Sequence, residues 1–221
     1  MTIAVPHIRL CAMAAAATYE ATAIPAFQDD MRTVHVFRSI INDIPAYSWE
    51  GTTDFWEWVL DFLAFRDPFT HKDYGPVHFG LMRDVMAVKA MILADLNSIG
   101  NPQYLFIGHS KGGGEVLLAH AEMKSIGYPP LATRAFEPPR VGTKALWDYL
   151  AGEDIQWTAT HNRHGTDLVT LVPDDIVPMP LLSPWVEGAN RMEIVVSDAL
   201  DIPNKHRMTA VLSGLPAIPL A

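Results

Sequence analysis

A serine with a glycine two residues before it and another two residues after it is the feature of this sequence most able to do chemistry. Residues 108–112 (GHSKG) have the pattern G-x-S-x-G, which places a serine on a turn so sharp that bulky neighbours would clash. Such a turn lifts the hydroxyl clear of the preceding strand. It also directs the next backbone N–H toward the oxyanion that forms when the serine attacks a carbonyl. The pattern predicts a nucleophilic Ser110 and an oxyanion donor at the N–H of Lys111.

A serine nucleophile needs a general base that a carboxylate holds in place. In the fold built around such a turn, these residues follow one another in the order serine, Asp or Glu, histidine. His206 is the only histidine after His164, so the chain order selects it as the base. Asp167 follows a segment expected to be a strand and is our first choice for the acid, with Asp175 as the alternative.

The apolar pattern around these residues predicts the elements that must position them. Residues 103–107 (QYLFI) form a short apolar run typical of a strand buried on both faces of a parallel sheet. Further strands are expected at 32–38, 133–136, 155–161 and 192–196. Helices are expected at 8–22, 55–65, 81–99, 113–125 and 144–150. This alternation predicts an α/β fold: a mostly parallel central sheet with flanking helices, in one small domain over residues 1–221.

The first 30 residues are expected to be an N-terminal helical segment. Its helix should bury the residues that fall on its apolar side, which are Leu10, Met13, Ala14, Ala17 and Ala21. The apolar run at 10–17 has the wrong flanks for a secretory signal peptide, because Pro6 and His7 precede it and basic residues are scarce. We therefore expect no signal peptide and slightly favour a cytoplasmic location.

Composition excludes several classes of function. The 221 residues carry a net charge of −9, which is unsuited to nucleic acid or to electrostatic docking on anionic lipid. The single cysteine, Cys11, cannot form an internal disulfide or a four-cysteine zinc site. His161 and His164 could imitate a pair of metal ligands, but no acidic or sulfur ligand completes a convincing set. We expect no metal, no cofactor and, because no apolar run approaches 18 residues, no transmembrane segment.

Seven segments, in order along the chain, resemble the class 3 lipases, the fungal-type family of the α/β-hydrolase superfamily. They are VHVFR at 34–38, TDFW at 53–56, VHFGL at 77–81, GHSKGG at 108–113, FEPPRVG at 136–142, the segment 162–173, and His206. The resemblance implies an α/β-hydrolase fold and hydrolysis of carboxylic esters, first of all lipid or acylglycerol esters, through an acyl-enzyme. It assigns the triad acid to Asp167 and the base to His206, and it implies no cofactor.

Three positions depart from the family pattern or leave it open. The family's Phe-Arg-Gly-Ser/Thr falls on residues 37–40, so the resemblance implies a second oxyanion donor at the backbone N–H of Ser39 or Ile40. The family carries its lid just after this point, which makes 40–54 a candidate mobile cover, although its apolar residues could equally be core. Lys111 replaces an apolar residue. It is either a surface lysine or a charge that favours an anionic substrate group or the oxyanion.

The G-x-S-x-G turn does not choose among ester classes. A short-chain esterase, a phospholipase or a thioesterase of the same fold remains an alternative to a lipase. A non-catalytic member that binds lipid or a partner protein also stays open, because of the departure at Ser39 and Ile40. The expected partner is an ester or lipid substrate, with transient contact to a lipid interface, and the oligomeric state is open.

Overall fold

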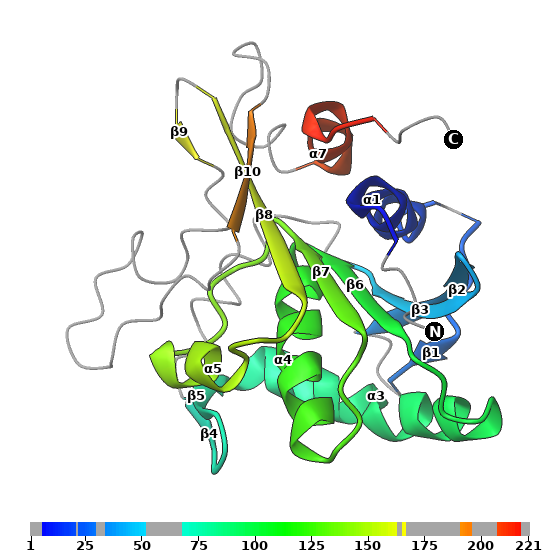
Figure 1. Ribbon diagram of the computed structural model, residues 1–221, viewed down its shortest axis with the longest axis vertical. Coiled ribbons are helices and arrows are strands. Elements are labelled where there is room, and N and C mark those ends of the chain that lie inside the picture. Colours follow the sequence, from blue (N-terminus) through cyan, green and yellow to red (C-terminus); the bar gives the residue numbers. More distant parts are fainter. Residues whose placement is uncertain are drawn as a thin grey trace.

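A computed structural model describes residues 6–20, 22–29, 34–51, 68–162, 165–166, 191–195 and 207–217. Within these ranges a central sheet carries helices on both faces (Figure 1). Asp167, Asp175 and His206 lie outside the described residues, as does the helix expected at 55–65.

The central sheet has the strand order β1-β2-β3-β6-β7-β8-β10, and β9 pairs with β8. Strands β3, β6, β7, β8 and β10 are mutually parallel, whereas β1, β2 and β9 pair antiparallel with their neighbours. The bounds are β1 Phe27–Gln28, β2 His35–Ile41, β3 Ile44–Trp49, β6 Leu105–His109, β7 Ala132–Phe136, β8 Ile155–Asn162, β9 Gly165–Thr166 and β10 Arg191–Val195. The predicted α/β fold with a mostly parallel sheet is confirmed. A separate antiparallel pair consists of β4 (Pro68–His71) and β5 (Gly75–His78).

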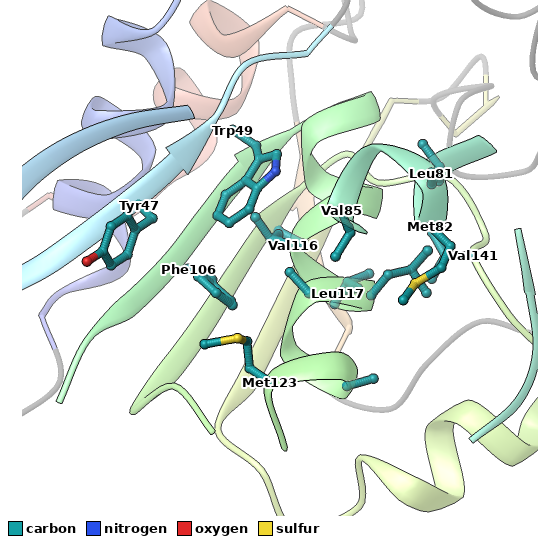
Figure 2. Close-up of a cluster of buried hydrophobic side chains, with 14 of the residues drawn as sticks. Tyr47, Trp49, Leu81, Met82, Val85, Phe106, Val116, Leu117, Met123 and Val141 are labelled. Atoms are coloured by element: carbon teal, nitrogen blue, oxygen red, sulfur yellow. The ribbon is translucent and has the colours of Figure 1, made fainter. Parts of the chain in front are cut away.

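Helices cover the two faces of the sheet with separate apolar cores. On one face lie α3 (Phe79–Ser98), α4 (Lys111–Ser125) and α5 (Lys144–Tyr149). On the other lie α1 (Ile8–Ala17) and α7 (Met208–Gly214). Figure 2 shows the first core, in which Trp49 and Phe106 of the sheet face Val85 of α3 and Val116 of α4. In the second core, α1 packs on β6, which contributes Leu105 and Ile107, and α7 packs on α1 and β10. The strand that leads to Ser110 is therefore buried on both of its faces.

Helix α1 begins where it was expected but ends at Ala17 and not near residue 22, and the face that it buries differs from the prediction. Its buried residues are Ile8, Cys11, Ala12 and Ala15, whereas Met13 is 51% exposed. The apolar side was misjudged because the helix is rich in alanine, and small side chains give a weak pattern of apolar spacing. In α3 the expected side is buried at Leu81, Val85, Val88, Ile92 and Leu96, while Ile99 lies beyond the helix and is 37% exposed.

Residues 40–49 form a hairpin of the central sheet and not a cover over it. A tight turn at Asn42 and Asp43, both with positive φ, joins β2 to β3, and positive φ at both positions is typical of a type I′ two-residue hairpin turn. Strand β3 is buried along its whole length and pairs with β2 on one side and β6 on the other. This part of the proposed lid is therefore corrected to an internal strand, and 52–54 lie outside the described residues.

No helix among the described residues is long and apolar enough to cross a membrane.

Candidate active site

Ser110 lies between the end of β6 and the first residue of α4, in a backbone conformation that a serine rarely adopts. Its φ is 57° and its ψ is −127°, which for a residue other than glycine costs on the order of 1–3 kcal/mol. The N–H of Ser110 donates to the carbonyl of Phe136 at the end of β7, at 2.9 Å. The neighbouring strand therefore helps to fix the turn. Such stored strain is typical of a nucleophile held on a strand-to-helix turn.

The two glycines of the motif are required by close backbone contacts. A Cβ on Gly108 would lie 2.2 Å from the carbonyl oxygen of Gly112, and a Cβ on Gly112 would lie 2.5 Å from the carbonyl oxygen of Trp49. Both distances are far below van der Waals contact. The first contact lets the backbone of Gly108 pack directly on that of Gly112 across the turn. The second lets the start of α4 pack against the end of β3.

The structure does not bring Ser39 and Ile40 to Ser110. In the hairpin, Ser39 pairs with Ala46 and Ile40 with Pro45, while Trp49 pairs with Gly108 on the other side of β3. Ser39 thus lies level with Ala46, which precedes Trp49, the partner of Gly108, by three residues along β3. At about 3.3 Å per residue, this separates the level of Ser39 from that of Gly108 by about 10 Å. Ser110 lies beyond Gly108 in the opposite direction. The antiparallel direction of β2 is the reason, because it runs away from the carboxyl ends of the parallel strands.

The segment that does reach Ser110 is the one that follows β3. A Cβ on Gly51 would lie 3.0 Å from the Cβ of Ser110 and 2.6 Å from the carbonyl oxygen of His109. Residues 49–52 read Trp-Glu-Gly-Thr, which keeps the glycine and the hydroxyl residue of the family's Phe-Arg-Gly-Ser/Thr. The sequence analysis missed this glycine-threonine pair, because it matched the family pattern to Phe37-Arg38 on the neighbouring strand β2. Thr52 itself lies outside the described residues.

The Lys111 side chain runs into the protein, where it forms a buried charge cluster with two carboxylates. Its Nζ lies 2.7 Å from Oδ2 of Asp84 on α3 and 2.9 Å from Oε1 of Glu115, one turn along α4. All three side chains are largely buried, and Arg83 adds a contact of 3.1 Å to Asp84. Lys111 is therefore neither a surface lysine nor an ammonium held out toward a substrate. It ties the first turn of α4, whose N–H groups face the nucleophile, to α3.

The two carboxylates share Lys111, and Arg83 adds a second positive charge beside Asp84. Glu115 is fully buried, and this desolvation raises its pKa to about 7, although the positive charge of Lys111 lowers it. Asp84 adds to the rise by repulsion. The neighbouring carboxylates in turn raise the pKa of Lys111, so the lysine stays charged throughout the neutral range. Near neutral pH the cluster therefore gains or loses one proton at Glu115.

This proton should make folding stability fall as the pH rises. An unperturbed glutamate has a pKa of 4.5, so between about pH 4.5 and 7 the folded chain keeps a proton that the unfolded chain has lost. Stability decreases across that window by up to about 1.4 kcal/mol per pH unit. In Glu115→Gln we expect this loss to disappear, which leaves the variant near wild type at pH 4.5 and about 2–3 kcal/mol more stable at pH 8.

Urea unfolding at several pH values measures this difference, with Glu20→Gln, a variant of an exposed side chain, as the control. A Glu115→Gln variant that is less stable than wild type at pH 8 would mean that Glu115 is ionised and well paired in the folded protein.

A further buried carboxylate outside this cluster, Glu137, was not singled out from the sequence. It follows β7 immediately, is fully buried, and has a φ of 53° where the family pattern has glycine. Its N–H donates to the carbonyl of Thr158 at 3.1 Å, and the Thr158 hydroxyl donates to Oε1 of Glu137 at 3.4 Å. A carboxylate at the end of the strand beside β6 also satisfies the order serine, acid, histidine. Its position makes it a further candidate for the acid.

No group of three His, Cys, Asp or Glu side chains in the described part of the chain could hold a metal ion.

The model of the family described as Lipase (class 3) matches residues 46–177, which include most of β3, the Ser110 turn and strands β7 to β9. The chain belongs to the class 3 lipase family. The match begins inside β3 and leaves out the segment 34–38, in agreement with the placement of Gly51, and not Ser39, beside the nucleophile.

Relatives of this class 3 lipase chain include fungal enzymes. Lipase A of Sodiomyces alcalophilus is 30% identical over 163 residues, which are 67% of this chain and 37% of the relative. A protein named secreted mono- and diacylglycerol lipase A, from Penicillium cyclopium, is 25% identical over 175 residues, or 71% of this chain and 52% of the relative. The chain thus spans 37% to 52% of the length of these curated relatives.

The fold of this class 3 lipase chain is that of solved lipases. The structure of the Rhizomucor miehei triacylglyceride lipase matches it with a TM-score of 0.66 at 18% identity, over 86% of this chain and 79% of the other. The expected α/β-hydrolase fold is therefore confirmed. The preference for a cytoplasmic location is contradicted, because the Penicillium relatives are named as secreted lipases.

Proposed function

We propose that this chain hydrolyses the ester bonds of acylglycerols through an acyl-enzyme on Ser110. The observation that carries the proposal is the strained Ser110 turn at the end of β6, with Gly51 packed against it. A serine hydroxyl fixed between a strand end and a helix N-terminus, beside a second backbone segment, is suited to attack on a carbonyl whose oxygen turns negative. Membership in the class 3 lipase family supports the same chemistry.

The proposed reaction has two steps. Ser110 Oγ attacks the ester carbonyl while His206 takes its proton, and the N–H groups of Lys111 and Thr52 bind the oxyanion. His206 then returns the proton to the departing alcohol, which leaves an acyl group on Ser110. Water, activated by His206, cleaves this acyl-enzyme. The acid that orients His206 is Asp167, with Asp175 and Glu137 as alternatives. The mechanism uses no metal and no organic cofactor.

The names of the relatives favour mono- and diacylglycerols as substrates and an extracellular site of action. Acylglycerol substrates predict that activity on p-nitrophenyl esters with acyl chains of two to sixteen carbons is highest for the long chains. They also predict hydrolysis of emulsified monoolein and diolein. A short-chain optimum would indicate the esterase alternative. A fluorophosphonate should attach to the peptide that contains Ser110, as mass spectrometry can show. If wild type neither turns over any ester nor takes the label, the non-catalytic alternative holds.

The same ester assay identifies the acid. In Asp167→Asn, Asp175→Asn and Glu137→Gln, loss of the acid should lower kcat by about 10⁴-fold, because an imidazole in the wrong tautomer cannot accept the serine proton. The two carboxylates that do not orient His206 should change kcat much less. If none of the three variants loses activity, the triad part of the proposal is wrong.

A further inference from the structure

The hydroxyl of Tyr19 joins two backbone segments that meet at Ser110. The N–H of Gly51 donates to Tyr19 Oη at 3.0 Å, and Tyr19 Oη lies 2.7 Å from Nδ1 of His109. The two rings meet edge to face, with centroids 5.6 Å apart. Gly51 follows β3, and His109 ends β6 immediately before the nucleophile. One side chain from the N-terminal segment therefore contacts both sides of the site.

We assign the direction of these hydrogen bonds so that each proton has an acceptor. Burial raises the pKa of Tyr19, so its hydroxyl keeps its proton at any physiological pH. When that hydroxyl donates to Nδ1 of His109 and its oxygen accepts from Gly51, both donors are satisfied. His109 is then neutral, with its ring proton on Nε2. The chain of bonds runs from the Gly51 amide through the phenol to the imidazole.

These hydrogen bonds decide which backbone amide of the Gly51 segment can donate to a substrate. The Gly51 N–H is taken by Tyr19, so it is not a donor to the oxyanion. Its bond fixes the orientation of the Gly51 residue, which Thr52 follows in the sequence. We propose that Tyr19 is a positioning residue of the oxyanion site, which holds the Gly51 segment against the Ser110 turn through its contact with His109. This proposal rests on the proposed function and adds to it the part that orients the second donor.

The fit around the phenol is close enough for such a role. A Cβ on Gly51 would lie 2.2 Å from Tyr19 Oη, so a side chain at that position would displace the phenol. Tyr19 itself is fixed at the end of α1, where its N–H donates to Ala16 at 3.2 Å and the hydroxyl of the preceding Thr18 donates to Ala15 at 2.8 Å. Helix α1 in turn packs on β6. The backbone that carries the Tyr19 phenol is thus fixed by α1 and by its packing on β6.

Tyr19→Phe tests the proposal, because it removes the hydroxyl and keeps the ring. We expect kcat to fall about 10- to 100-fold with KM little changed, since a small displacement of a donor affects the transition state more than the bound ester. Binding of a trifluoromethyl ketone, which forms a tetrahedral adduct with the serine, should weaken by the same factor as kcat/KM. The matched control is Tyr74→Phe, which removes a buried phenol that donates to Glu122 at 2.8 Å, outside the active site. It should lose stability but keep wild-type kcat.

A second pair of variants tests the acceptor. His109→Asn keeps a hydrogen-bond acceptor near the position of Nδ1 and should retain kcat within about threefold of wild type. His109→Leu removes the acceptor and should resemble Tyr19→Phe. If Tyr19→Phe keeps the kcat of Tyr74→Phe, or if its loss lies entirely in KM, Tyr19 does not position the oxyanion site.

Failure of the proposed function can be told apart from failure of this inference. A wild-type chain that hydrolyses no ester would refute the first. Hydrogen exchange of the Gly51 amide, followed by NMR, would still test the second, because Tyr19→Phe should speed that exchange about tenfold or more. Unchanged exchange would show that the phenol does not hold Gly51.

Discussion

Replacement of Ser110 by alanine is expected to lower kcat for ester hydrolysis by at least about 10⁴-fold, because the oxygen that forms the acyl-enzyme is gone. The fold should survive, since alanine fits wherever serine does and no hydrogen bond of the Ser110 side chain caps α4. The measurement is the ester assay with purified wild type and variant, together with loss of the fluorophosphonate label. Ser125→Ala is the matched control. It lies in the last turn of the same helix, where its hydroxyl donates to the carbonyl of Glu122 at 2.8 Å.

Ser110→Gly adds a test of the strain in the turn. Glycine adopts a φ of 57° without steric cost, but it also increases the entropy of the unfolded chain. The net expectation is a variant as inactive as Ser110→Ala and about 1 kcal/mol more stable than it. Equal stability of the two variants would show that the strain at Ser110 is no larger than the entropic cost of the glycine. Residual activity in both would show that another residue is the nucleophile.

Replacement of Lys111 by leucine, the residue that the family pattern carries there, is expected to destabilise the protein by about 3 kcal/mol. The leucine would leave Asp84 and Glu115 buried without the ammonium that lies 2.7 Å and 2.9 Å from them. Lys124→Leu is the matched control, because Lys124 is on the same helix and pairs with the more exposed Glu153 at 2.7 Å. That variant should cost less than about 1 kcal/mol. Chemical denaturation of both variants measures the difference.

Lys111→Leu also separates a structural role from a role in substrate choice. Because the ammonium is engaged by two carboxylates, kcat/KM should fall by the same factor for a neutral ester and for one that carries a carboxylate. A loss confined to the anionic ester would show that Lys111 recognises the substrate. A variant as stable as wild type would show that the buried cluster contributes nothing to folding.

The sequence alone predicted the parts of the fold and site that depend on local patterns. The strand before Ser110, the turn, helix α4 and helix α3 are set by apolar spacing and glycine positions within about 20 residues, and the structure has them where they were expected. The close contacts of Gly108 and Gly112 give the physical reason for the motif. Such features can be read locally because neighbouring residues decide them.

The second oxyanion segment could not be placed in the same way, because its position depends on strand order. Phe37-Arg38 and Gly51-Thr52 each match part of one family pattern, and local sequence does not say which strand lies beside β6. The structure decides it, since β3 pairs with β6 and β2 does not. The same strand was mistaken for a cover because it is apolar on both faces, without the alternation that marks a strand with one exposed face.

The contact between the first and last described helices has a consequence for synthesis of the chain. Nη1 of Arg9 donates to the carbonyls of Leu212 and Leu215, at 3.0 Å and 2.9 Å. The ribosome makes α1 early and its partner α7 more than 190 residues later. Until then, α1 and β10 lack the helix that packs against them, and partly covered apolar surfaces aggregate readily. A truncation before residue 207 should therefore yield insoluble protein, although every other strand and helix described above has already been made.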